Sequence, residues 1–325
     1  MASLAPGFNT ILSATSIKIK TATKADCWVF NGGIAEDDPF WSNFYSQPKI
    51  ERLTFNVRAD GGLTYIPAKV IVRLDRLQYL NIQYANIFSL PSFAFTNSTT
   101  LREIILQKNK ITKLEKMSFA HLIMLSNVSL VENQISELKR DVFYVLPNLQ
   151  RENFQGLSNL ITLDMRNNKL RMIGDLAFAE LWSLQELYLD GNEIEFISER
   201  GFGGLSQLRK LSLADNKLGT LDDGVLDDIL KLNVLDLRNN NFETLKQETV
   251  QNVFENMKSN YALISLDGKF YFGIVFTPAH LIFQIKMLLI FNDLHSTLLA
   301  TPIAYRFACI NLYINLFSKC PLRNY

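Results

Sequence analysis

Cysteine and histidine are scarce in this chain, and the two signs of charge nearly cancel. The 325 residues contain three cysteines and three histidines, and the formal net charge is +1. Three cysteines are too few for a disulfide framework, and their odd number leaves at least one unpaired within the chain. A balanced charge gives no electrostatic case for a nucleic acid or an acidic membrane as the partner.

The sequence also lacks the motifs that carry catalysis or metal binding. There is no glycine-rich phosphate loop and no pair of closely spaced cysteines. The acidic residues Asp222, Asp223, Asp227 and Asp228 lack the spacing of an EF-hand, so a solvated surface turn is expected there. We therefore expect no enzyme activity, no cofactor and no metal ion.

What the sequence does contain is a spacing of 24 residues that recurs in two residue types. The asparagines on this spacing fall in two runs, Asn109 and Asn133, then Asn168, Asn192, Asn216 and Asn240. The phenylalanines also fall in two runs, Phe95, Phe119 and Phe143, then Phe154, Phe178 and Phe202. A period of this size through most of a chain indicates a solenoid, in which each unit packs only on its neighbours.

One unit reads LxxLxLxxNxLxxIxxxxFxxL, as in the stretch from Leu184 to Leu205. This pattern matches the leucine-rich repeat signature, and about residues 50–273 resemble that superfamily in its 24-residue "typical" form. The resemblance implies an α/β solenoid, a horseshoe with a parallel concave β-sheet. Its convex side would consist of irregular, 3-10 or short helical segments.

The repeated positions have a physical reason that is independent of the resemblance. Alternation in the xLxLx stretch points the leucines inward and the variable residues outward, as in a β-strand. The chain must then bend, and an asparagine side chain can satisfy the backbone groups of that bend, because it has an acceptor and two donors. We expect the six asparagines to form a buried ladder, and the phenylalanines to stack on the convex side.

The repeat spacing is interrupted once. Phe143 and Phe154 are 11 residues apart, and Asn133 and Asn168 are 35 apart, so each interval is 13 short of a multiple of 24. The strand and asparagine of one unit are missing after Gln150. The explanations are an incomplete gene model, a small natural deletion or a selected hinge. We predict that the strand near 128–130 pairs directly with the one near 163–165, and that an irregular unit, 136–159, lies on the convex side.

The ends of the chain depart from the repeat. Residues 1–49 form an N-terminal segment with an aromatic cap, 50–273 the solenoid, and 274–325 an apolar tail without the repeat. Residues 274–291 are apolar enough to be considered as a membrane span, although they contain Lys286, and membrane association through 274–317 stays open. The alternative is sequence that was not selected to fold, since the tail lacks the cysteine-containing cap of extracellular relatives.

The variable strand residues are the candidate binding site. As a set they are polar, mixed in charge and include tyrosine and arginine, which suits a protein interface. The candidates on the concave face are Tyr79, Asn81, Gln83, Glu103, Gln107, Ser129, Asp164, Arg166, Glu186, Tyr188, Asp190, Lys210, Asp236 and Arg238.

These observations favour a non-catalytic protein that binds a protein or peptide. The repeat subtype resembles that of animal, insect-like extracellular proteins of the adhesion, guidance or immune kind. Asn97 and Asn127 begin N-x-[ST] sequences, the acceptors of N-glycosylation, which is weak support for secretion. The first 26 residues show no signal peptide, which favours the alternative, an intracellular scaffold or adaptor. The sequence does not indicate the oligomeric state.

Overall fold

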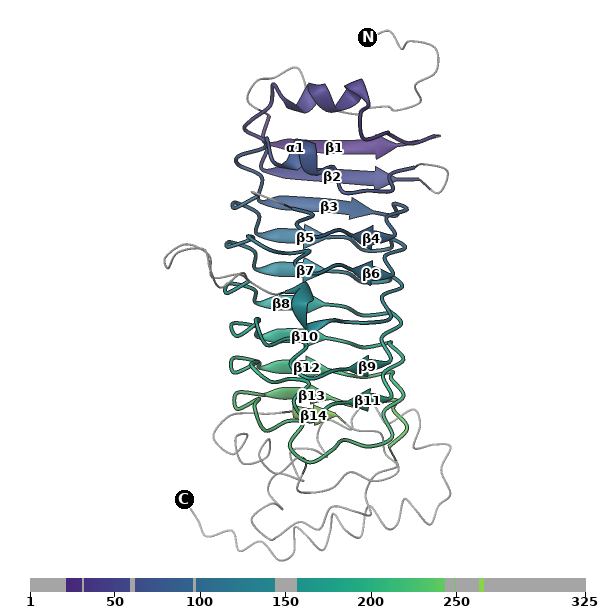
Figure 1. Cartoon of the computed structure of the whole chain (residues 1–325), viewed down its shortest axis with the longest axis vertical. Coiled ribbons are helices and arrows are strands. Elements are labelled where there is room, and N and C mark those ends of the chain that lie inside the picture. The colour runs from purple at the N-terminus through teal and green to yellow at the C-terminus, as the bar shows by residue number, and fades with distance from the viewer. Residues whose placement is uncertain are drawn as a thin grey trace, which may run out of the picture. The chain divides into compact units, whose positions relative to one another are not determined.

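The computed structural model describes residues 22–30, 32–58, 62–95, 98–143, 157–242, 249 and 263–265. All of them lie in one compact unit, 1–274, while 275–325 forms a second unit outside the described residues. The predicted solenoid with a parallel sheet is confirmed: ten strands pair in the order β1-β2-β3-β5-β7-β8-β10-β12-β13-β14 (Figure 1). Their bounds are β1 Lys24–Val29, β2 Arg52–Val57, β3 Tyr79–Gln83, β5 Glu103–Ile105, β7 Asn127–Ser129, β8 Thr162–Asp164, β10 Glu186–Tyr188, β12 Lys210–Ser212, β13 Val234–Asp236 and β14 Leu263–Ser265.

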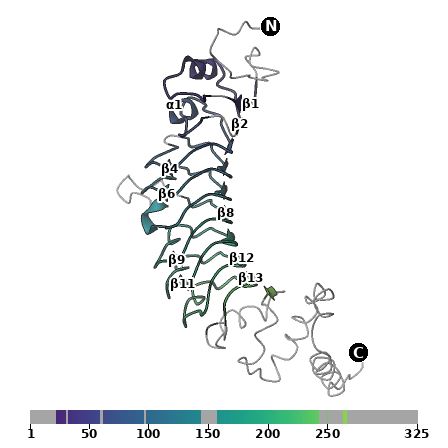
Figure 2. The ribbon, with the colours of Figure 1, turned by 90° about the vertical axis from the view of Figure 1, so that its right-hand side faces the viewer.

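The opposite side of the stack has little regular structure, as the resemblance implies. Figure 2 shows two short sheets along this side, and the long sheet along the other. The two short sheets pair β4 (Ser89–Leu90) with β6 (Lys113–Leu114), and β9 (Met172–Ile173) with β11 (Phe196–Ile197). The described helices are α1 (Ala68–Ile71) and two 3-10 segments, η1 (Pro39–Phe44) and η2 (Arg140–Val142). None of the described helices has the length and hydrophobicity to cross a membrane.

The core is a column of aliphatic side chains closed by stacked phenylalanines. The inward leucines of the central strands are fully buried, as at Leu163, Leu187 and Leu211. The rings of Phe95, Phe119 and Phe143 stack with centroids 5.8 Å apart, and those of Phe178 and Phe202 lie 6.2 Å apart. The predicted aromatic column is confirmed for these five residues, and Phe154 lies outside the described residues.

The interruption in the repeat leaves the sheet continuous, as predicted. Val128 pairs with Leu163, so β7 and β8 keep the register of neighbouring strands elsewhere in the sheet. Asn168 Nδ2 donates to Leu130 O at 3.0 Å, and Ile135 N donates to Asn168 Oδ1 at 3.0 Å. The shortened unit therefore removes a strand without removing a contact between turns. Of the predicted irregular unit 136–159, residues 144–156 lie outside the described residues.

At the N-terminal end the sheet extends past the boundary predicted at residue 50. Strand β1 pairs in parallel with β2 from Lys24 opposite Arg52, although this segment carries no repeat signature. The buried Trp41 packs on Phe55 of β2, with ring centroids 5.8 Å apart, so the aromatic cap covers the first turns. Cys27 is a free, fully buried thiol, and burial raises its pKa to about 12. Exposed and buried residues alternate along β1, as expected for a strand with one face in the core. Its exposed side chains, such as Trp28, therefore lie on the outer surface of the sheet.

At the other end, β14 pairs with β13, with Ile264 opposite Leu235. This register follows the longer step of 29 residues between the last two units. The aliphatic position is thus kept although the spacing differs. The predicted tail, 274–325, lies outside the described residues, as does the membrane-association hypothesis for 274–317.

Candidate functional site

The buried edge of the sheet is held by the predicted asparagine ladder. Asn192 Nδ2 donates to Leu189 O of its own turn at 2.9 Å and to Met165 O of the preceding turn at 3.0 Å. Its Oδ1 accepts from Leu170 N at 3.1 Å. Each such side chain therefore joins two turns. The same three contacts recur at Asn133, Asn168, Asn216 and Asn240.

The ladder is incomplete at its first rung. Asn109 Nδ2 donates to Ile82 O at 2.8 Å and to Leu106 O at 3.0 Å, as in the other turns. Its buried Oδ1 has no hydrogen-bond partner among the described residues. Asn109 therefore makes donor contacts alone, and the turn before it carries Ala85 in the asparagine position.

A second regularity, which the sequence did not reveal, lies one residue before each ladder position. Every one of these residues has a positive φ, between 54° and 66°. They are Tyr84, Lys108, Glu132, Asn167, Gly191, Asp215 and Asn239. The left-handed conformation turns the chain out of the strand, and the residue types differ too much from turn to turn to give a sequence signal.

The predicted binding residues all lie on the outer surface of the ten-stranded sheet, which we call the sheet face. Arg166 and Arg238 are exposed, whereas Asn81 and Asp164 are only 7% and 9% exposed. Both are bonded to a neighbouring side chain of the sheet face, Asn81 to Tyr79 and Asp164 to Arg166. The remaining candidates are half-buried, namely Tyr79, Gln83, Glu103, Gln107, Ser129, Glu186, Tyr188, Asp190, Lys210 and Asp236.

Two arginines of the sheet face are clamped by aspartates two residues earlier. Arg166 Nε donates to Asp164 Oδ1 at 2.9 Å, and Arg166 Nη2 donates to Asp164 Oδ2 at 2.6 Å. Arg238 makes the same pair of bonds to Asp236 at 3.0 and 2.7 Å. Residues i and i+2 of a strand share a face, which explains the repeated geometry. The hydrogen bonds to Asp164 raise the pKa of Arg166, and the bidentate geometry fixes the guanidinium.

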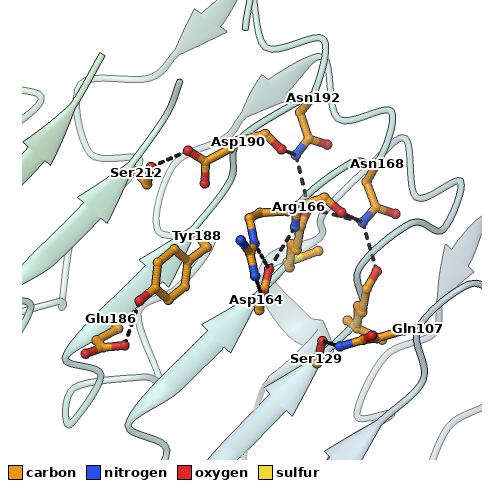
Figure 3. A network of polar contacts seen from close by, with 12 residues as sticks. Gln107, Ser129, Asp164, Arg166, Asn168, Glu186, Tyr188, Asp190, Asn192 and Ser212 are labelled. Carbon is orange, nitrogen blue, oxygen red and sulfur yellow. Dashed lines mark hydrogen bonds and ion pairs between the residues drawn. The ribbon is translucent and has the colours of Figure 1, made fainter. Parts of the chain in front are cut away.

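Tyr188 lies on β10 and its side chain is drawn beside Glu186 and Arg166 in Figure 3. Its hydroxyl donates to Glu186 Oε2 at 2.9 Å. Lys210 Nζ lies 4.7 Å from the centroid of the tyrosine ring, and Arg166 Cζ lies 5.3 Å from it. Burial raises the pKa of Tyr188, so its phenol stays protonated and remains a donor at neutral pH.

Next to this tyrosine, Ser212 Oγ donates a hydrogen bond to Asp190 Oδ1, and Asp190 Oδ2 has no hydrogen-bond partner among the described residues. Ser212 occupies the same strand position as Tyr188, so it lies on the sheet face, as the register of the repeat predicts. We refer below to the central cluster, which consists of Asp164, Arg166, Glu186, Tyr188, Asp190 and Ser212, all labelled in Figure 3, together with Lys210.

The other candidates lie outside the central cluster. Gln107 Nε2 donates to Ser129 Oγ at 2.9 Å, one strand further toward the N-terminus (Figure 3). Tyr79 and Asn81 interact with each other on β3. Of the two glycosylation candidates, Asn127 is exposed at the start of β7, whereas Asn97 lies outside the described residues.

The sequence places Trp28 and Phe30 in the N-terminal aromatic cap, with a binding patch of these aromatics as the less favoured alternative, and it assigns no role to Arg52. Trp28 is 41% exposed, and Arg52 points outward beside Tyr79. The alternation of apolar and other residues in Lys24–Val29 was the available signal, but the absence of the repeat motif obscured it. Within the described part of the chain, no group of three or more His, Cys, Asp and Glu side chains is arranged to hold a metal ion.

The family model for leucine-rich repeats matches residues 75–135, 146–194, 158–218, 183–242 and 206–253, which together cover more than half of the chain. The chain belongs to the leucine-rich repeat family. Repeats of this family are typically non-catalytic binding modules, and a protein-binding role is consistent with them. The matched ranges contain most of the sheet-face candidates and the whole asparagine ladder.

Individual leucine-rich repeat proteins resemble parts of this chain. Connectin of Drosophila melanogaster is 38% identical over 88 residues, which is 27% of this chain and 13% of Connectin. A leucine-rich repeat protein of Leptospira interrogans superposes with a TM-score of 0.61 at 22% identity, covering 80% of this chain and 58% of that one. TLR13 in complex with ssRNA13 gives a TM-score of 0.59 at 22% identity, covering 76% of this chain and 36% of TLR13. The two structures show a shared fold, and this chain spans less than two thirds of each of the three proteins.

Proposed function

We propose that this protein is a non-catalytic recognition module that binds a protein or peptide through the central cluster of the sheet face. The observation that supports the proposal most strongly is the fixed arrangement of Arg166 and Tyr188 (Figure 3). Arginine and tyrosine are enriched among the residues that dominate binding energy. Here both side chains are held in place before any partner arrives.

The hydrogen bonds within the cluster reduce the entropic cost of binding. A long side chain that becomes immobile on association loses about 0.5–1.5 kcal/mol of favourable free energy. Asp164 already holds Arg166, and Glu186 already holds the hydroxyl of Tyr188, so much of this loss occurs on folding. Ser212 Oγ already donates to Asp190 Oδ1, so this carboxylate is held in the same way.

The charges of the cluster favour a protein over a nucleic acid. Asp164, Glu186 and Asp190 outnumber the cations Arg166 and Lys210, and the whole chain has a net charge of only +1. A nucleic acid needs several unpaired cations to replace the counterions of its phosphates. The similarity to TLR13, whose structure contains ssRNA13, is therefore taken as a similarity in fold alone. The sheet face is suited to a partner of mixed charge.

The binding test compares two sheet-face variants with a matched control. The purified chain is screened against an array of secreted and cell-surface ectodomains, and each hit is titrated by surface plasmon resonance. We expect Arg166→Ala and Tyr188→Ala each to weaken a genuine hit by about tenfold or more, as for residues that dominate an interface. The control is Arg171→Ala, which removes an exposed arginine outside the long sheet.

Two results would contradict the proposal. One is a hit that tolerates both sheet-face substitutions as well as the control. The other is a loss of thermal stability in Tyr188→Ala equal to that of a core substitution, since this would mean that the cluster is structural.

We further propose a cell-surface or extracellular location, with an intracellular scaffold as the alternative. The repeat subtype supports the first, as does the exposed acceptor sequence at Asn127. The test is to treat the native protein, isolated from tissue, with an endoglycosidase and to measure its mass. A loss of mass that the Asn127→Gln variant no longer shows supports export. A native protein without N-glycan, recovered from the cytosolic fraction, would support the scaffold.

A further inference from the structure

The first three strands of the sheet carry a second polar surface that differs from the central cluster. It consists of Trp28 and Phe30 at the end of β1, Arg52 and Arg58 at the two ends of β2, and Tyr79 of β3. We call it the arginine–aromatic patch. We propose that this patch binds an acidic segment of a protein partner, with Arg52 as the residue that receives a carboxylate. The inference extends the proposed recognition role to a second zone of the same face.

Arg52 lies over the ring of Tyr79. Its Cζ atom is 3.6 Å from the centroid of the Tyr79 ring, the shortest such distance among the described residues. The tyrosine is itself held from below, since Asn81 Nδ2 donates to its hydroxyl at 3.2 Å. A guanidinium that stacks through its face keeps its planar fork of N–H donors at the edge, where a carboxylate can bind both at once.

Arg52 differs from the other two sheet-face arginines, Arg166 and Arg238, in its ion-pair partners. Arg166 and Arg238 each give their N–H donors to an aspartate of the same strand. Arg52 has no ion pair with a carboxylate in the part of the chain that the structure describes. Among these three arginines it is therefore Arg52 that retains an unneutralised charge together with a fixed orientation.

The neighbouring side chains make the patch cationic and partly apolar. The outward positions of β1 and β2 carry three cations, Lys24, Arg52 and Arg58, and one carboxylate, Asp26. Arg58 Cζ lies 5.6 Å from the centroid of Phe30, and the rings of Phe30 and Trp28 stack 6.4 Å apart. An acidic segment with apolar side chains complements this combination in both charge and surface.

A single-stranded nucleic acid is the competing occupant, because bases stack on aromatic rings. The patch offers only three cations and also contains the carboxylate of Asp26, so it can neutralise few phosphates, and nucleic-acid affinity grows with that number. Nucleic-acid binding is therefore treated as an outcome that overturns the proposal.

The experiment uses fluorescein-labelled octaglutamate as the probe and the full chain as the receptor, at physiological ionic strength. Fluorescence anisotropy should show binding to the wild-type chain, and none for octaglutamine. Arg52→Gln should weaken octaglutamate binding by about tenfold, as expected for the loss of a charge-assisted bidentate contact. Arg52→Lys should weaken it several-fold, because lysine keeps the charge but loses the fork and the stacking.

Arg73→Gln is the matched control. It removes the same charge, and Arg73 also lies over a tyrosine ring, 4.2 Å from the centroid of Tyr45, but outside the strands of the sheet. This variant should bind octaglutamate within about twofold of wild type, since a remote charge acts only through the screened field. Circular dichroism of each variant reports whether the fold is kept.

Three outcomes would overturn the proposal. They are equal losses in Arg52→Gln and Arg73→Gln, octaglutamate binding that does not change in Arg52→Gln, and tighter binding of a labelled oligouridylate than of octaglutamate. Failure here is separable from failure of the proposed function. Arg166→Ala should leave octaglutamate binding unchanged, whereas it should abolish or weaken the ectodomain hits.

Discussion

The buried asparagine positions and the sheet-face positions of each turn differ in how strictly their residues and contacts repeat. Along the buried edge, Asn192, Asn216 and Asn240 make the same three hydrogen bonds at nearly the same distances. On the sheet face, the equivalent positions change from Tyr188 to Ser212 in the next strand, and so do their partners. Positions that repeat therefore build the stack, and positions that vary are available for binding.

The largest test of this comparison is an inward leucine against its outward neighbour. Leu187 is fully buried, so Leu187→Ala should lower the free energy of unfolding by about 3 kcal/mol, through lost burial and a cavity. Tyr188→Ala, one residue on, should lower it by less than about 1 kcal/mol, as for a surface position. Urea titration followed by circular dichroism measures both. Equal losses would mean that the sheet face also holds the stack together.

Within the ladder, the number of satisfied bonds should decide the cost of losing an asparagine. Asn192→Ala leaves the buried amide of Leu170 without its partner and removes one of the two asparagine donors to each of Met165 O and Leu189 O, so it should cost about 2–3 kcal/mol. Asn109→Ala should cost about 1 kcal/mol less, because Asn109 Oδ1 accepts no bond to begin with. The same urea titration ranks the pair, and a larger loss for Asn109→Ala would refute the bond-counting argument.

Substitutions at the positive-φ residue before each ladder position should change stability less than loss of a ladder asparagine. Gly191→Ala should destabilise the protein by about 1 kcal/mol, because alanine is strained at φ +66° and its Cβ would lie 2.2 Å from Asn167 Oδ1. Glu132, at φ 54°, is the reverse case, and Glu132→Gly should be neutral to within about 0.5 kcal/mol. Thermal unfolding of both variants is the measurement. A destabilising Glu132→Gly would show that the side chain matters more than the backbone conformation.

The aspartate–arginine clamps should have the smallest effect on stability. Asp236→Asn breaks the ion pair with Arg238, whose side chain is 56% exposed, so the loss should be below about 1 kcal/mol and should shrink further at high salt. The unfolding midpoint in low and high salt checks this. A loss of several kcal/mol would mean that the clamp stabilises the fold, and that it is not mainly available for binding.

The repeated positions were predictable because each one carries its own residue type. The ladder, the phenylalanine stack and the direct pairing of β7 with β8 all follow from counting residues between identical side chains. The positive φ was not predictable, because tyrosine, lysine, glutamate and glycine all occupy that position and only the backbone repeats.

The sheet face was predictable as a set of positions, but its interactions were not fully so. The i, i+2 spacing of Asp164 and Arg166 could have indicated their clamp, since both were already assigned to one face. The contact of Lys210 with Tyr188 joins two turns and depends on rotamers that no spacing reveals. Trp28 was assigned to the aromatic cap because β1 joins the sheet without the leucine pattern that marks the other strands, and Arg52 lies at the start of β2, in the irregular first unit of the repeat.

The pairing of β7 with β8 across the shortened unit has a practical consequence. The sheet and the ladder fix Asn133 on one side of this unit and Asn168 on the other, with the same contacts that join turns of regular length. The length of chain between them is therefore decoupled from the register of the sheet. A fluorescent domain or an affinity tag could be spliced into this connection to label the protein, while every outward-facing strand residue keeps its place.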